Sequence, residues 1–112
     1  MLKKQYVKTR KVAKVTFELA TTEIPKDIGA ESATVVGDFN EWDPVATPMT
    51  YSKKKKAFRA TVELEPGQSY QFRYFINGQF WFNDWQADGY LPGEFGEDNC
   101  VVVAPIWPET LN

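Results

Sequence analysis

The chain has 112 residues, a length that fits one domain with one hydrophobic core and not two. Hydrophobic residues make up 43% and charged residues 25%, a balance that excludes a disordered chain. The formal net charge of -2 gives no electrostatic case for nucleic acid as a general partner. No apolar run approaches the ~20 residues that span a bilayer. We therefore expect neither nucleic acid nor a membrane among the partners.

The charge is distributed unevenly along the chain. Lysines and arginines dominate the segment before the first acid, Glu18, and residues 53–56 are four consecutive lysines. We interpret these segments as a solvated basic arm and a solvated hairpin tip. An anionic partner is the alternative interpretation.

The cysteine content and the first residues bear on the cellular compartment. Cys100 is the only cysteine, so no internal disulfide can form. It lies in a Val-rich run and is predicted to be a small buried hydrophobe, which fits a reducing compartment. The basic first residues lack the apolar stretch of a secretory signal, so a cytoplasmic location is predicted.

The first half of the chain predicts short strands separated by turns. Val15, Phe17 and Leu19 alternate with polar residues, which is typical of a half-buried strand. A short apolar run over residues 33–36 is followed by turn-forming residues 37–44. Residues 49–52 are a further short strand, with the four lysines at the tip of the hairpin that follows.

The second half has the clearest alternation. Apolar residues occupy every second position over 58–64 and again over 70–76, which predicts two strands. Asn77-Gly78 is a strong hairpin signal, because type I′ turns need positive φ at both positions. Residues 79–82 are the predicted return strand and 100–103 the closing strand. Residues 83–99 are predicted to be one long loop, a feature that is often functional.

About seven short strands without a helical period predict an all-β protein, an immunoglobulin-like antiparallel β-sandwich. We assign the sandwich to residues 15–103. Residues 1–14 are a basic arm or a first edge strand, and residues 104–112, which include Trp107, are a tail.

The residue types argue against catalysis. The chain has no histidine, the commonest general base and metal ligand, and a single cysteine cannot build a zinc site. No phosphate-binding glycine motif is present. Paired carboxylates such as Asp38 and Glu41 leave a glycosidase as a minor alternative. We expect no enzyme, no catalytic residues, no metal site and no cofactor.

Aromatic residues reach 15% of the chain, more than the core of such a sandwich needs. A neutral sugar offers an apolar C–H face to an aromatic ring and hydroxyls to planar polar side chains. Trp42 in a turn-rich loop, Trp81 after the hairpin and Arg73 on the face opposite Phe72 suit such a ligand. The alternative for each tryptophan is a packing role.

Three motifs carry a resemblance to a known family: GDFNEW at 37–42, YQFRYFING at 70–78 and FGEDN at 95–99. In this order and spacing they resemble the glycogen-binding domains of carbohydrate-binding module family 48. Such domains also form the N-terminal early-set domain of isoamylases and glycogen-branching enzymes, and occur in the β subunit of AMP-activated protein kinase. The resemblance runs from about residue 15 to 103. It implies an immunoglobulin-like sandwich that binds an α-1,4-glucan such as glycogen, starch or a maltooligosaccharide.

The resemblance also implies roles for individual residues. Trp42 matches the first stacking tryptophan, and Arg73 matches a basic residue, often lysine, that hydrogen-bonds sugar hydroxyls. Asn99 matches a glucan-binding asparagine, and Phe95 an aliphatic residue that pushes into the sugar ring. Glu97 matches a position that is threonine in the kinase-type modules, so this chain departs from the family pattern there.

The second tryptophan of the family depends on the length of the hairpin turn. A two-residue turn would pair Phe75 with Phe80 and place Phe80 on the face of Arg73. A three-residue turn would pair Phe75 with Trp81 and place Trp81 there, which is the alternative we favour. Trp85 and Tyr90 either extend the groove or form a hydrophobic plug under the long loop.

The sequence therefore predicts a non-catalytic α-glucan-binding module. The alternative is a protein-interaction module that docks a glucan-metabolising enzyme and does not itself bind sugar.

Overall fold

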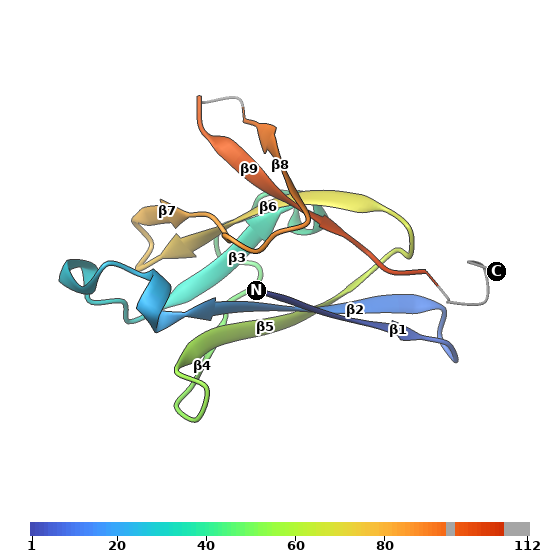
Figure 1. Ribbon diagram of the computed structural model, residues 1–112, viewed down its shortest axis with the longest axis horizontal. Coiled ribbons are helices and arrows are strands. Elements are labelled where there is room, and N and C mark those ends of the chain that lie inside the picture. The colour runs from blue at the N-terminus through green and yellow to red at the C-terminus, as the bar shows by residue number, and fades with distance from the viewer. Residues whose placement is uncertain (94–95, 107–112) are drawn as a thin grey trace.

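The computed structural model describes residues 1–93 and 96–106, and these residues form nine strands in two antiparallel sheets (Figure 1). The strands are β1 Leu2–Val7, β2 Val12–Ala20, β3 Ala33–Gly37, β4 Thr50–Ser52, β5 Ala57–Leu64, β6 Ser69–Ile76, β7 Phe80–Phe82, β8 Gly89–Pro92 and β9 Asp98–Val103. Three single-turn 3₁₀ helices join them: η1 Thr21–Glu23, η2 Lys26–Ile28 and η3 Asp38–Asn40. Within the described ranges, no helix has the length and apolar character that crossing a membrane requires.

The two sheets pack face to face as a sandwich. The first, called sheet A, has the strand order β1-β2-β5-β4, and the second, sheet B, has the order β3-β6-β9-β8. Strand β7 also belongs to sheet B and pairs with β6. Figure 1 shows sheet B above sheet A. The predicted all-β, immunoglobulin-like sandwich is confirmed.

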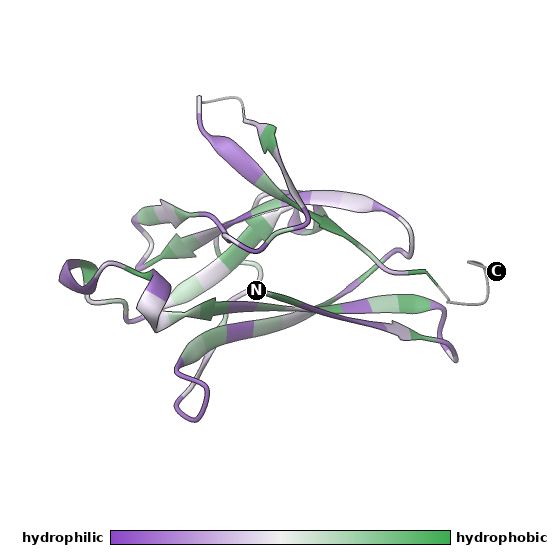
Figure 2. Ribbon diagram, in the orientation of Figure 1, coloured by the Kyte–Doolittle hydropathy of each residue, from purple (hydrophilic) through white to green (hydrophobic). Residues whose placement is uncertain are grey.

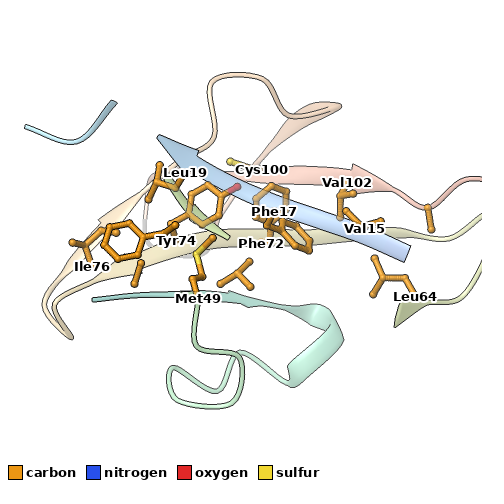
Figure 3. Packing of buried hydrophobic residues seen from close by; sticks show 14 of the residues in the cluster. Val15, Phe17, Leu19, Met49, Leu64, Phe72, Tyr74, Ile76, Cys100 and Val102 are labelled. Carbon is orange, nitrogen blue, oxygen red and sulfur yellow. The ribbon is translucent and has the colours of Figure 1, made fainter. Parts of the chain in front are cut away.

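The core lies between the sheets and consists of the alternating residues of the central strands (Figure 3). Val15, Phe17 and Leu19 of β2 are at most 1% exposed, as predicted. Phe72 and Tyr74 of β6, in the opposite sheet, are also fully buried. The rings of Phe17 and Phe72 meet edge to face with their centroids 4.9 Å apart. Burying each large apolar side chain contributes about 1.5–3 kcal/mol, so this pairing fixes which face of each sheet points outward.

The first residues form a strand at the edge of sheet A. Strand β1 pairs antiparallel with β2 from Leu2 opposite Phe17 to Val7 opposite Val12. Strand β2 therefore begins before the alternating residues that predict it, at Val12.

The prediction of one long loop over 83–99 is wrong. This stretch contains the whole of β8, and β9 begins within it at Asp98. Gly89 and Pro92 bound β8, and both residue types are depleted in strands, so the pattern gave no strand signal. Pro92 is tolerated because β8 is an edge strand, where a missing backbone donor costs little.

Candidate functional site

The outward face of sheet B is centred on β6. Because Phe72, Tyr74 and Ile76 point into the core, the alternate side chains Gln71, Arg73 and Phe75 point outward. We call this the outer face of sheet B. Trp81 pairs with Phe75 and lies on this face, and Asn99 lies there because its neighbour Cys100 pairs with Phe72.

The turn between β6 and β7 decides which aromatic ring joins this face. The turn has three residues: Ile76 pairs with Phe80, and Gln79 N–H donates to the Ile76 carbonyl at 2.9 Å. Asn77 and Gly78 both have positive φ, at 54° and 64°. Trp81 is therefore on the face of Arg73, whereas Phe80 lies on the core side at the end of the sheet, 38% exposed.

Arg73 is held in place by its neighbours on this face. Its Nε donates to Asn83 Oδ1 at 2.7 Å, and its Nη2 lies 2.9 Å from a carboxylate oxygen of Glu97. The guanidinium carbon is 5.9 Å from the centre of the Trp81 ring, a distance at which cation and ring attract. Since a guanidinium has five N–H donors, further donors remain for a ligand.

The Trp81 ring is supported from its own sheet. It packs on Phe75 with ring centroids 4.3 Å apart and an interplanar angle of 30°. Trp81 remains 41% exposed. The ring therefore has one supported side, and part of its surface is open to solvent.

Asn99 is tied to β6 by a side chain that the sequence did not single out. Asn99 Nδ2 donates to Gln71 Oε1 at 3.1 Å. Neither Asn99 Oδ1 nor Gln71 Nε2 has a hydrogen-bond partner among residues 1–93 and 96–106. One acceptor and one donor are therefore open to a ligand beside Arg73. The alternation of residues 70–76 was the signal that could have placed Gln71 on this face.

Trp42 lies in the loop after β3, which runs beside strand β6. Glu41 and Trp42 have positive φ, both 59°, a conformation that costs side-chain-bearing residues about 1–2 kcal/mol each. The loop is held by Trp42 N–H donating to the Gly37 carbonyl at 2.9 Å, and by Asn40, which bonds the backbone of both Gly37 and Val35. Such strain persists only where the surroundings enforce it, and it is common at functional sites.

Asp38 connects Trp42 to β6. Its Oδ1 accepts a bond from the Trp42 indole N–H at 2.9 Å, and its Oδ2 accepts one from the Gln71 backbone N–H at 2.7 Å. The half-buried Trp42 indole is thus oriented by a carboxylate that is itself bonded to the central strand. The sequence motif contains Asp38, but its positioning role requires the pairing of β3 with β6.

Other residues named from the sequence lie in different places. Tyr90 pairs with the buried Cys100, which turns its side chain away from the outer face, and its hydroxyl donates to the Asp84 carbonyl at 2.6 Å. Leu91, the next residue, pairs with Asn99 and lies on the outer face, 48% exposed. Trp85 lies in the turn after β7, 72% exposed. Phe95 and Trp107 are outside the described residues.

A buried polar cluster is centred on Asp84, which follows β7. Asp84 is fully buried, and it accepts bonds from the Tyr74 hydroxyl at 2.7 Å, from Gln86 N–H at 2.8 Å and from the Met1 ammonium. Burial, and next the charge of Asp84, hold the pKa of Tyr74 well above its ordinary value. Burial also raises the pKa of the Cys100 thiol to about 11. Among the described residues, no three metal-ligating side chains come together.

The outer face of sheet B thus presents the Trp81 ring beside the planar polar side chains of Gln71, Arg73 and Asn99, and Trp42 is tied to the same strand through Asp38. Rigid aromatic surface beside amide and guanidinium groups is typical of carbohydrate-binding domains. The sequence profile of carbohydrate-binding module 48, described as the isoamylase N-terminal domain, matches residues 28–91. The chain belongs to this family. The matched range includes Trp42, Arg73 and Trp81 and ends before Asn99. A comparison with curated protein sequences finds no significant match.

Proposed function

We propose that the chain binds α-1,4-linked glucan, such as glycogen, starch or a maltooligosaccharide, on the outer face of sheet B. The observation that carries the proposal is the position of Trp81. It lies on the same face as Arg73 and Asn99, and its ring is backed by Phe75. Family membership adds that related domains bind carbohydrate.

The chemistry of the face suits a neutral sugar. The Trp42 and Trp81 rings would stack on the C–H faces of glucose units. Arg73 would donate to sugar hydroxyls, and Asn99 Oδ1 and Gln71 Nε2 would complete the set with one acceptor and one donor. Each ring and each net hydrogen bond contributes about 1 kcal/mol, so we expect dissociation constants of roughly micromolar to millimolar.

Several site residues have narrower roles in this proposal. Glu97 holds Arg73 in place through its ion pair, and Leu91 adds apolar surface beside Asn99. Phe95 stays a proposed sugar contact from the family pattern alone. Tyr90 and Phe80 take no direct part, because their side chains leave the face on the other side of the sheet.

The test is retardation of the native protein in gels that contain glycogen. Wild type should be retarded, and Trp42→Ala and Trp81→Ala should each lose retardation while keeping the wild-type circular dichroism spectrum. Tyr51→Ala is the matched control, since Tyr51 lies on sheet A and is 43% exposed against 41% for Trp81. No retardation of folded wild type, or normal retardation of Trp81→Ala, would contradict the proposal.

We further propose that the domain is non-catalytic and cytoplasmic. Binding by stacked rings on a flat sheet face needs no reacting group. The unpaired, fully buried Cys100 is compatible with a reducing compartment.

A second candidate function is docking of a glucan-metabolising enzyme without sugar binding. The observation that favours it is Trp85, which lies in the turn after β7 and is 72% exposed. Exposed tryptophans are enriched at the centre of protein interfaces. Co-purification of such an enzyme that is unaffected by maltooligosaccharide and lost in Trp85→Ala would support this candidate.

A further inference from the structure

The two sheets differ sharply in charge. The chain has 13 lysines and arginines and 15 acidic residues. Residues 1–20 and 53–64 contain eleven of these cations and only two of the acids, Glu18 and Glu63. The rest of the chain is left with two cations and thirteen acids. The small net charge is therefore the sum of two unequal parts: residues 1–20 and 53–64 are strongly basic, and the rest of the chain is strongly acidic.

The basic segments form three strands of sheet A and two of its turns. They provide β1, β2 and β5, the turn at 8–11 between β1 and β2, and the turn at 53–56 between β4 and β5. The turns lie at opposite ends of the sheet, and the 53–56 turn projects at the bottom of Figure 1, where Figure 2 shows it as strongly hydrophilic. The basic charge thus spans the length of the sheet.

The surface between the two turns is polar. Because Val15 and Phe17 point into the core, Lys14 and Thr16 point outward, and Thr16 bonds Thr61 of β5 across the sheet at 2.8 Å. A shallow hollow of about 360 Å³ lies here. It is lined by Lys3, Lys4, Gln5, Lys14, Thr16 and Thr61. We call this surface, together with its two turns, the basic face.

The two acids of the basic face are already neutralised. Glu18 is 9% exposed and contacts three cations: Lys3 at 3.1 Å, Arg59 at 3.0 Å and Lys55 at 3.8 Å. Glu63 pairs with Arg10. By contrast, five lysines have no ion pair with any carboxylate of the described residues: Lys11, Lys14, Lys53, Lys54 and Lys56. Their charge is available to an external anion.

We propose that the basic face docks on the surface of an anionic lipid bilayer. Clusters of lysines near a membrane are attracted by anionic headgroups, and the basic face carries cations at both of its ends as well as between them (Figure 1). The association is electrostatic and lies on the membrane without crossing it. Our expectation of no membrane partner rested on the absence of a spanning segment and does not address this mode of binding.

The composition of the basic face favours an anionic lipid surface over a protein partner and over single-stranded nucleic acid. Protein interfaces are enriched in arginine and aromatic residues and depleted in lysine, whereas the unpaired cations here are all lysines. Proteins that bind single-stranded nucleic acid stack bases on aromatic rings. The exposed ring of sheet A, Tyr51, pairs with the buried Phe58 and so lies on the other side of the sheet.

The separation of the two sheets limits the effect of charges that lie on the outer face of sheet B. Packed sheets lie about 10 Å apart, and the Debye length at physiological salt is about 8 Å. Charges on the outer face of sheet B, such as Glu97 beside Arg73, are therefore screened from a surface that touches sheet A. The same geometry turns the outer face of sheet B, with Trp81, away from the membrane.

The test is cosedimentation of the protein with vesicles, measured without any glucan so that its outcome does not depend on the proposed sugar site. We compare phosphatidylcholine vesicles with vesicles that contain roughly one third phosphatidylserine, at about 0.1 M and about 0.5 M NaCl. The variant Lys53→Gln/Lys54→Gln/Lys56→Gln removes three unpaired lysines. The variant Gln68→Glu/Gln79→Glu/Gln86→Glu has the same net charge but places the change on exposed positions outside sheet A.

We expect binding to the phosphatidylserine vesicles alone, lost at the higher salt. Each lysine near an anionic surface contributes about fivefold, so the triple lysine variant should bind at least about tenfold more weakly, and the glutamate variant should bind like wild type. Three outcomes would overturn the proposal. They are no binding to anionic vesicles, equal weakening in the two variants, and binding to a double-stranded DNA fragment but not to vesicles.

Discussion

The indole nitrogen of Trp42 lies 2.9 Å from a carboxylate oxygen of Asp38, and the second oxygen of Asp38 lies 2.7 Å from the backbone nitrogen of Gln71. One short side chain thus fixes the position of a loop tryptophan relative to the central strand of sheet B. In an otherwise irregular loop, this contact places an aromatic ring at a defined site.

The first prediction concerns Asp38 as a positioning residue. Asp38→Ala should weaken glycogen binding about tenfold, because a hydrogen bond to a charged group contributes about 1.5–3 kcal/mol in favourable cases and this one is partly exposed to solvent. Asp38→Asn keeps one acceptor oxygen, so its affinity for glycogen should fall between that of wild type and that of Asp38→Ala. Gel retardation measures the affinity, and the difference in tryptophan emission between the variant with and without the additional change Trp42→Phe reports the displacement of Trp42. Asp43→Ala in the same loop is the control, and equal weakening in both variants would contradict the role.

The second prediction concerns Gly37. Its φ of -170° is open to any residue, so the requirement for glycine is steric: a Cβ would overlap the Gln71 carbonyl oxygen and lie 2.9 Å from Phe72 Cβ. Gly37→Ala should lower the free energy of unfolding by about 1–3 kcal/mol, as overpacking does in cores. Urea denaturation measures the change. Gly89→Ala, whose Cβ would meet only Val101 at 3.9 Å, should leave stability within about 0.5 kcal/mol of wild type.

The third prediction concerns the Cys100 thiol. Burial raises its pKa from the ordinary 9.0 to about 11, so the reactive thiolate is scarce at neutral pH and lies out of reach in the folded chain. Labelling with an aromatic disulfide reagent should be slow in native protein and fast in urea. Since the folded pKa is raised, the stability contributed by the thiol is complete below pH 9 and is lost as the pH rises toward 11. Rapid labelling of native protein would contradict this placement.

The fourth prediction concerns Glu18 in acid. Burial opposes its ionisation, but hydrogen bonds from Lys3 and Arg59 outweigh burial and lower the pKa of the carboxyl below its ordinary 4.5. The stability from this group is therefore present above about pH 4.5 and is lost as the pH falls through the folded pKa. Glu18→Gln should be less stable than wild type at pH 7, and the difference should shrink on acidification. Glu63→Gln, at an exposed pair, is the control in urea titrations at each pH.

Much of the fold was predictable because alternation over a strand directly reports which side is buried. Residues 15–19, 58–64 and 70–76 became β2, β5 and β6 with the expected inward faces. Strand β8 was not predictable, because a four-residue edge strand with Gly89 and Pro92 owes its existence to pairing with β9. The residues of β8 by themselves do not indicate that β9 lies beside them.

The main members of the proposed site come from the sequence, whereas the contacts between them do not. Family spacing and the hairpin gave Trp42, Arg73, Trp81 and Asn99. The roles of Gln71, Asp38 and Leu91 depend on which strands are neighbours, a long-range property. The sequence left two alternatives open for Tyr90, because the register of β8 against β9 decides its face and a shift by one residue would reverse it.

Strand β6 pairs with β3 along one edge and with both β9 and β7 along the other. The proposed site residues, which are spread from Asp38 to Asn99 in the sequence, are therefore brought together by their pairing with this one strand. Pairings so distant in sequence form late during folding, after the cost of closing long loops has been met. A glucan that needs all of them can bind only the finished sandwich. Its effect on kinetics should then appear as slower global unfolding, with the refolding rate unchanged. Amide protons of β6 should gain the most protection from exchange when sugar is added.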